Sequence, residues 1–207
     1  MTQVLHIHPK NPQLRLIHQA VAALRAGALI VYPTDSSYAL GCSIGDKHSM
    51  ESIRRLRQID EQHHFTLVCR DLKEIATYAR VDNSAYRFLR AYTPGPYTFL
   101  LQATREVPRR MQHPKRKTIG VRVPGNIVAQ TLLAELNAPL VSSTLHLPGE
   151  EYPVSDIDDL VYDKLRNQLE LILEGGGCGM QPTTVIDLLE TPPTVIRQGK
   201  GEFVLGV

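Results

Sequence analysis

The sequence predicts an α/β protein, and three observations support this class. Short apolar runs of the β type, such as residues 29–32, alternate with segments whose apolar residues recur every three or four positions. Strands and helices that alternate in this way build a sheet covered by helices. The chain has 207 residues, of which 43% are hydrophobic and 21% charged, enough for one sizeable core. We therefore expect one domain spanning residues 1–207.

Cysteine usage and hydropathy indicate the cellular compartment and the kinds of partner to expect. The three cysteines, Cys42, Cys69 and Cys178, are odd in number and lack metal-type spacing, which predicts reduced thiols and a cytoplasmic location. The first twelve residues contain no apolar core of signal-peptide length, and no stretch is long enough to cross a bilayer. The adjacent His63 and His64 have no third ligand at a suitable spacing. We expect neither a membrane partner nor a protein-held metal.

The net charge of +2 conceals an uneven distribution. Residues 51–122 contain 15 Lys and Arg against 7 Asp and Glu, whereas residues 123–207 contain 4 against 12. This division predicts an electropositive surface, the footprint expected for phosphate or nucleic acid. The alternative is that the fold mixes these segments in space and the asymmetry disappears.

The first helix is expected over residues 12–26, with Asn11 as its N-cap and Gly27 after its end. It leads into the strand of residues 29–32, which Pro33 ends. The polar residues 34–38 follow. They are interpreted either as groups delivered by a strand end to a ligand cleft, or as a turn closed by its own side-chain hydrogen bonds.

A second helix is expected over residues 47–58, capped by Asp46, with Arg54, Arg55 and Arg57 crowding its last turn. Cations at this end complement the helix dipole, and anion binding is a second hypothesis for them. A strand near residues 65–69 and two helices within 71–92 follow. The turn of residues 93–96 then breaks the helix, and a strand begins at residue 97.

The segment 105–117 is the most basic of the chain, with one acid, Glu106. Such a run is either a solvated face or a nucleic-acid contact. It leads into a strand over residues 118–123 in which Arg122 faces opposite to its apolar neighbours. Because an unpaired arginine is costly to bury, Arg122 should hold an acid or a ligand anion.

The remaining elements alternate in the same way. Asn126 caps a helix, the segment 139–149 follows, and an acidic helix capped by Ser155 is expected over residues 156–170. A strand then runs into the glycines 175–177. A last strand is expected within residues 194–199.

Several of these segments resemble the YrdC/YciO family of threonylcarbamoyladenylate synthase-like proteins. PTDSSYALG, residues 33–41, is similar to the family signature P-T-E-T-x-Y-G-L, and residues 118–124 match T-x-G-x-R-x-P. Residues 183–188 and the pair Arg197 and Gly199 resemble its closing motifs. The resemblance extends through six motifs from residue 11 to 199. It implies a twisted mixed β-sheet flanked by helices around a deep, positively charged cleft.

Two departures from the family pattern affect the expected site. When the sequence is aligned with the family motifs L-K-x-R-P and H-P-L, Arg57 stands at the position of the lysine and Ile59 at that of the arginine. His63 stands at the position of the histidine. Laid over P-L-x-x-x-S-A-N-x-S-G, the sequence places Thr144 at the serine and His146 at the asparagine. An alkyl group thus replaces one anion-facing cation, and an imidazole that titrates near neutral pH replaces an amide.

The first hypothesis is condensation of L-threonine, bicarbonate and ATP, with Mg²⁺ accompanying the triphosphate, for N6-threonylcarbamoyladenosine formation in tRNA. The resemblance assigns Arg57 and Arg122 to the anionic groups of the reactants. It assigns the remaining binding positions to Thr34, Tyr38, His63, Ser143, Thr144, His146, Thr184 and Arg197.

The second hypothesis is a nucleotide- and RNA-binding protein, for tRNA or double-stranded RNA, with weak or no synthase activity. The departures at Ile59 and His146 favour it and point to the YciO branch of the family. The candidate RNA contacts are Arg54, Arg55, Arg109, Arg110, Lys115, Arg116 and Lys117. Carbamoyl or adenylyl transfer to another small molecule is a third hypothesis.

Overall fold

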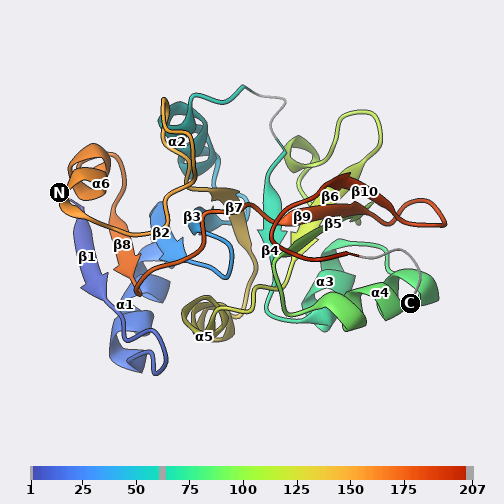
Figure 1. Ribbon diagram of the computed structural model, residues 1–207, viewed down its shortest axis with the longest axis horizontal. Coiled ribbons are helices and arrows are strands. Elements are labelled where there is room, and N and C mark those ends of the chain that lie inside the picture. The colour runs from blue at the N-terminus through green and yellow to red at the C-terminus, as the bar shows by residue number, and fades with distance from the viewer. Residues whose placement is uncertain (1, 61–63, 204–207) are drawn as a thin grey trace.

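The computed structural model describes residues 2–60 and 64–203, and their strands form one mixed sheet (Figure 1). The strand order is β1-β8-β2-β3-β7-β4-β6-β5-β9-β10. The strands are β1 (Gln3–His6), β2 (Ile30–Pro33), β3 (Tyr38–Ser43), β4 (Thr66–Val68), β5 (Tyr97–Gln102), β6 (Thr118–Arg122), β7 (Leu140–Thr144), β8 (Leu171–Glu174), β9 (Thr184–Asp187) and β10 (Thr194–Arg197). The pairs β1–β8, β8–β2, β4–β6 and β5–β9 are parallel, and the other neighbours are antiparallel. The predicted mixed α/β class is confirmed.

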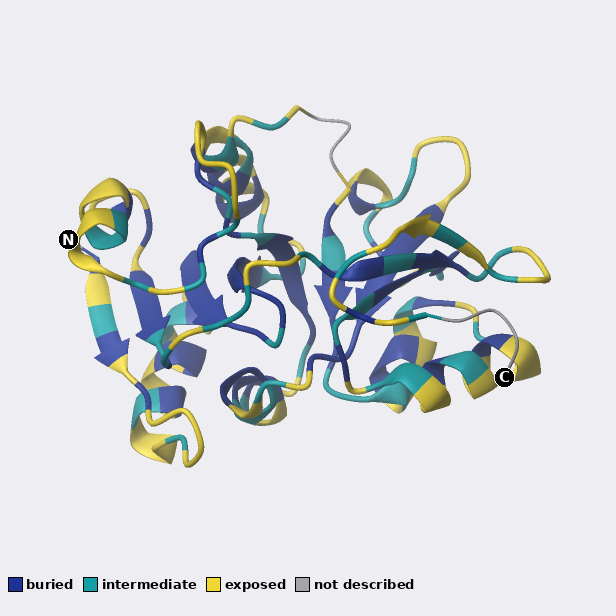
Figure 2. Ribbon diagram, in the orientation of Figure 1, coloured by how far each residue is buried: buried dark blue, intermediate teal, exposed yellow. Residues whose placement is uncertain are grey.

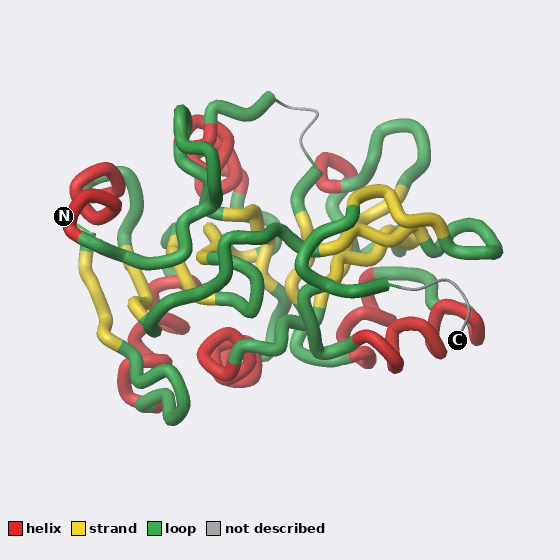
Figure 3. The backbone as a smooth tube through the Cα atoms, viewed as in Figure 1, coloured by secondary structure: helices red, strands yellow, loops and turns green. Residues whose placement is uncertain are grey.

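Helices lie on both sides of this sheet (Figure 1). They are α1 (Leu14–Arg25), α2 (Lys47–Arg57), α3 (Leu72–Tyr78), α4 (Asn83–Tyr92), α5 (Ile127–Leu136) and α6 (Asp159–Leu165). A 3₁₀ turn, Arg109–Met111, interrupts the loop from β5 to β6, which appears at the upper right of Figure 3. No helix in the described part combines the length and apolar character needed to span a bilayer.

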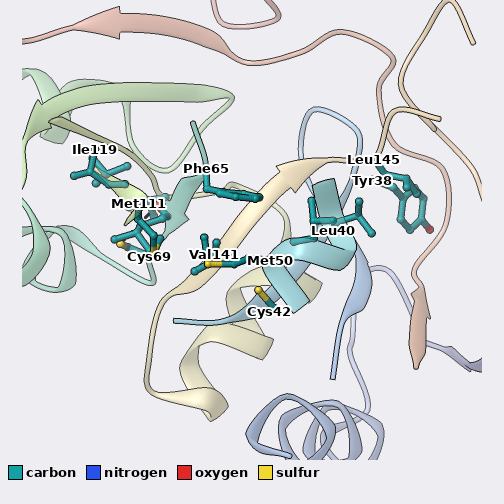
Figure 4. Close-up of a cluster of buried hydrophobic side chains, with 14 of the residues drawn as sticks. Tyr38, Leu40, Cys42, Met50, Phe65, Cys69, Met111, Ile119, Val141 and Leu145 are labelled. Atoms are coloured by element: carbon teal, nitrogen blue, oxygen red, sulfur yellow. Dashed lines mark hydrogen bonds between the residues drawn. The ribbon is translucent and has the colours of Figure 1, made fainter. Parts of the chain in front are cut away.

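The core has two parts. In one, α1 and α5 pack against each other and against β2 and β8, with Ile17, Leu24 and Leu132 fully buried between them. The other contains apolar residues of α2, α3 and α4 and of the central strands, including Leu40, Met50 and Val141 (Figure 4). The strands are mostly buried, and the exposed residues gather on loops and on the outer sides of helices (Figure 2).

Two helix starts differ from the prediction. Helix α1 begins at Leu14 instead of residue 12, and the Gln13 side chain accepts a 3.0 Å hydrogen bond from the His8 amide instead of capping the helix. Helix α6 begins at Asp159 because the Asp158 carboxylate caps it by accepting a hydrogen bond from Val161 N. In both cases hydrogen bonds between residues close in sequence accompany the shifted start of the helix. The predicted caps Asp46 and Asn126 are confirmed.

Candidate functional site

A pocket of about 320 Å³ opens over the middle of the sheet. This volume lies at the lower end of the roughly 300–1,000 Å³ usual for small-molecule sites. Strands β3, β7, β4, β6, β5, β9 and β10, which follow one another in the sheet, or the residues flanking them, supply most of its wall. Its lining residues are Thr34, Ser36, Ser37, Ala39, Arg57, His64, Phe65, Thr66, Val68, Thr98, Leu100, Gly120, Arg122, Ser142, Ser143, Thr144, Thr183, Val185, Ile196 and Arg197. Three are arginines, and none of these described lining residues is an acid.

The turn between β2 and β3 forms one wall and is built around the Thr34 hydroxyl. This hydroxyl donates to Ser37 O at 2.6 Å and accepts from the amides of Ser36 and Ser37 at 3.1 and 3.3 Å. The turn is therefore closed by its own side chain, as one sequence interpretation proposed. Because Thr34, Ser36 and Ser37 also line the pocket, the other interpretation, polar groups at a strand end facing a cleft, describes the same residues.

Arg122 on β6 is the most enclosed cation of the pocket, with a side chain 8% exposed. Its Nη2 donates to Asp35 Oδ1 and, at 3.4 Å, to Thr34 Oγ1. The other Asp35 oxygen, Oδ2, accepts from Gly125 N at 2.8 Å. Arg122 Nε is buried and lacks a hydrogen-bond partner in the described part of the chain. The sequence prediction that Arg122 pairs with an acid is confirmed, and the acid is Asp35, which follows Thr34 directly.

Arg57, the last residue of α2, also lines the pocket. Its Nη1 donates to the Ser143 hydroxyl at 2.5 Å, so helix α2 and strand β7 jointly orient the guanidinium group. Burial lowers the pKa of Arg57 below its ordinary value, because desolvation disfavours the charged form. An anion in the pocket would offset this cost.

Arg197 on β10 completes the cationic set. Its Nη2 donates to Thr183 O at 2.8 Å, and the Thr183 hydroxyl lies 2.9 Å from that of Thr98. Burial lowers the pKa of Arg197 as well. The floor between Thr98 and Thr66 is open because Gly120 lies there. A Cβ at residue 120 would lie 3.3 Å from both threonine side chains.

Three residues expected in the binding site lie elsewhere. The Tyr38 hydroxyl points into the interior, where it donates to Gly176 O at 2.8 Å and accepts from Gly175 N at 3.1 Å. Figure 4 shows Tyr38 among the buried side chains, beside Leu145. His146 Nε2 bonds the backbone oxygen of Glu150 at 2.9 Å, outside the pocket lining.

Thr184 is the third. It is fully buried, and its hydroxyl donates to Gly201 O at 2.5 Å and accepts from Gly199 N at 2.9 Å. Strand alternation explains the difference, because neighbouring side chains of a strand point to opposite faces. Thr183 therefore takes the position expected of Thr184, and Thr184 fastens the C-terminal segment.

The predicted histidine cannot be placed, since His63 lies outside the described residues. Its neighbour His64 lines the pocket, with its ring centroid 4.8 Å from that of His113. Burial, followed by the charge of His113, lowers the pKa of His64. Within residues 2–60 and 64–203, no three His, Cys, Asp or Glu side chains lie together as a metal-binding group.

The seven basic residues expected on an RNA surface do not share one environment. Arg54 is only 13% exposed, pairs with Glu51 at 2.5 Å and lies 5.1 Å from the Phe65 ring centroid. Arg116 pairs with Asp187 at 2.5 Å, and Arg110 donates to Gly45 O. These three are held by the protein itself. The exposed members of the set are Arg55, Arg109, Arg110, Lys115, Arg116 and Lys117.

Several lining residues were not predicted, notably Ser142, Thr98 and Thr66. Each is a hydroxyl residue that belongs to a strand, next to apolar residues that the core buries, and this pattern could have indicated them. Six of the site residues predicted from the sequence do line the pocket, namely Thr34, Arg57, Arg122, Ser143, Thr144 and Arg197.

Comparison with known proteins agrees with this architecture. Residues 22–199 match the Sua5/YciO/YrdC family model, which is described as telomere recombination. The chain is 54% identical to the Escherichia coli protein YciO over 98% of each chain, and the YciO crystal structure superposes with a TM-score of 0.92. A threonylcarbamoyl-AMP synthase from Coxiella burnetii is 30% identical, over 84% of this chain and 92% of that protein. The structure of P. abyssi Sua5 complexed with L-threonine has a TM-score of 0.86 at 23% identity, over 96% of this chain and 58% of Sua5.

Proposed function

Because the chain belongs to the Sua5/YciO/YrdC family, we propose that its pocket binds ATP with L-threonine and bicarbonate and forms threonylcarbamoyladenylate. The observation that carries the proposal is the convergence of Arg57, Arg122 and Arg197 on one pocket whose described lining contains hydroxyls and no acid. Such a site suits a ligand that is anionic at more than one point. Relatives named threonylcarbamoyl-AMP synthase support the choice of reaction.

The reaction needs positioning and charge stabilisation more than a side-chain nucleophile. The threonine amine and bicarbonate join as a carbamate with loss of water. A carbamate oxygen then attacks the α-phosphorus of ATP, and the bond to pyrophosphate breaks. Mg²⁺ bound to the triphosphate would supply charge neutralisation, and the pocket arginines would contact the remaining phosphate oxygens. Arg57 and Arg197, which line the pocket, are the cations proposed for the phosphates. Arg122 pairs with Asp35 and holds the wall of the pocket.

The experiment that tests this function is pyrophosphate release by the purified protein. We expect release only when ATP, L-threonine and bicarbonate are all present. The Arg57→Gln variant should lose about two orders of magnitude in rate, as expected on removal of a group that stabilises developing charge. Release that continues without threonine or without bicarbonate would contradict the proposed reaction and point to transfer onto another small molecule.

Ile59 allows a sharper test of the family departure. The residue is half-buried, is not part of the pocket lining, and its amide donates to Arg54 O at 3.1 Å. If the missing cation limits the rate, the double variant Arg57→Lys/Ile59→Arg should release pyrophosphate faster than the natural chain. An unchanged rate of pyrophosphate release in a folded double variant would show that the missing cation at residue 59 does not limit the rate.

A second candidate function is binding of tRNA or double-stranded RNA with weak or no synthase activity. Arg55 and Lys115 favour it, because both are exposed and neither forms an ion pair within the described residues. Retention of RNA should then weaken steeply as salt rises. Replacing both residues by Gln should weaken it further and leave pyrophosphate release unchanged. RNA retention that is absent at low salt would remove this candidate.

A further inference from the structure

A second hollow, of about 840 Å³, lies beyond the ends of β5 and β6 and shares no lining residue with the pocket described above. We call it the basic hollow and define it by its four cations, Arg80, Arg105, Arg109 and Lys117. All four are exposed. None of its described lining residues is acidic or aromatic.

The four cations have no competing partners within the described residues. None of them forms an ion pair or a side-chain hydrogen bond there, in contrast to Arg110 and Arg116 of the same segment. The one acid nearby, Glu106, does not line the hollow and forms no ion pair in the described part. Four like charges around one hollow repel one another, so an anion bound between them would relieve the repulsion as well as pair with each.

Backbone contacts hold the segments that carry these cations together. Arg80 N donates to Gln102 O at 2.8 Å, and Ala103 N donates to Lys117 O at 2.9 Å. Thr104 N donates to Tyr78 O at 2.9 Å, so the end of α3, the end of β5 and the start of β6 form one frame.

The loop that carries Arg105 and Arg109 is fixed to the same frame. Val107 and Met111 anchor it in the core at 1% and 2% exposure, on either side of Arg109. Gln112 Nε2 also donates to Val107 O at 2.8 Å, which closes the loop on itself. The four cations therefore extend from a backbone that is already ordered, which lowers the entropic cost of binding an anion.

We propose that the basic hollow is a second anion site that takes a compact oligophosphate, such as a triphosphate group. The cations come from separate segments and converge on one hollow. A single nucleic-acid strand would instead require a row of cations with aromatic side chains for its bases, and a duplex is bound through phosphates spread along its length. Arginine forks at Arg80, Arg105 and Arg109 bind phosphate oxygens in pairs, and Lys117 adds a point charge.

Calorimetric titration with inorganic tripolyphosphate tests this assignment. The double variant Arg80→Gln/Lys117→Gln should weaken binding at the hollow by about tenfold or more, because it removes two charge-assisted contacts. The control Lys115→Gln changes an exposed lysine of the same loop that does not line the hollow, and it should leave affinity within about twofold. Circular dichroism and thermal melting establish that each variant is folded.

Two further measurements distinguish binding at this hollow from binding in the proposed synthase pocket and from RNA binding. The variant Arg57→Gln should retain tripolyphosphate binding at the hollow, and Arg80→Gln/Lys117→Gln should retain threonine-dependent pyrophosphate release. The proposal is overturned if Arg57→Gln abolishes all tripolyphosphate binding, or if Lys115→Gln weakens it as much as the double variant. It is also overturned if short duplex RNA binds through Arg80 and Lys117 while tripolyphosphate does not.

Discussion

Asp35 and Arg122 form an ion pair that connects two walls of the candidate site. Asp35 lies within the turn that Thr34 organises, and Arg122 ends strand β6. Through its second oxygen Asp35 also accepts from Gly125 N, so the β2–β3 turn is tied to the segment that leads into α5. A Cβ at Gly125 would lie 3.1 Å from that oxygen. The pair therefore balances charge and also fixes the geometry of the pocket wall.

Breaking this pair should be costly. The Asp35→Asn variant leaves Arg122 enclosed without its acid, and we expect the free energy of unfolding to fall by about 3 kcal/mol. Urea denaturation measures the loss. A double-mutant cycle with Arg122→Gln should give a coupling of about 1–3 kcal/mol. The exposed pair of Arg166 and Asp163, at 3.3 Å, serves as control. Additive effects of the two substitutions would contradict the role of the pair.

Tyr38 should contribute to stability and not to ligand binding. Removing its hydroxyl in Tyr38→Phe leaves Gly175 N and Gly176 O without their partner, at a cost of about 1–3 kcal/mol. The affinity for ATP, measured by titration calorimetry, should stay within about twofold. The matched variant Tyr86→Phe changes a tyrosine that is 47% exposed, and its stability should not change measurably. If the Tyr38→Phe variant lost its affinity for ATP while its stability stayed unchanged, Tyr38 would be part of the binding site.

The neighbours Thr183 and Thr184 should differ in how the same substitution affects ATP affinity. Thr183→Val removes a pocket hydroxyl that also lies 2.9 Å from that of Thr98, so it should weaken ATP binding by about tenfold and lower the free energy of unfolding by about 1 kcal/mol. Thr184→Val removes the partner of Gly201 O and Gly199 N, so it should lower the melting temperature and leave the ATP affinity of the folded protein unchanged. Equal effects of both variants on affinity would show that the two side chains are not separated as described.

The cysteines should be unreactive near neutral pH. Burial raises the pKa of Cys178 to about 11 and that of Cys42 to about 12. At pH 8 about one Cys178 thiol in a thousand is then a thiolate, compared with about a quarter for a free cysteine. Iodoacetamide labelling, followed by mass spectrometry, should be slow in the native protein, rise with pH up to about 11, and become fast in denaturant. Native labelling of Cys178 at the denatured rate would contradict this.

Local sequence was sufficient for some features and insufficient for others. Asp46 and Asn126 act as caps because each needs only the amides that follow within three residues. Arg122 could be expected to bind an acid, because an arginine between apolar strand residues must be compensated. The predicted cap Asn11 was wrong, because the sequence pattern did not show that α1 begins after Gln13, whose side chain accepts from His8 N.

By itself the sequence determined the α/β class, the family resemblance and six of the polar residues that line the pocket. These follow from periodicity, from caps and from motifs that keep their order along the chain. Only the tertiary structure decided that Tyr38 and Thr184 face the interior, that Asp35 is the partner of Arg122, and that Arg80 joins the basic loop around a second hollow. The physical reason is that the direction of a side chain and the identity of its partner depend on strand register and on contacts between residues far apart in sequence.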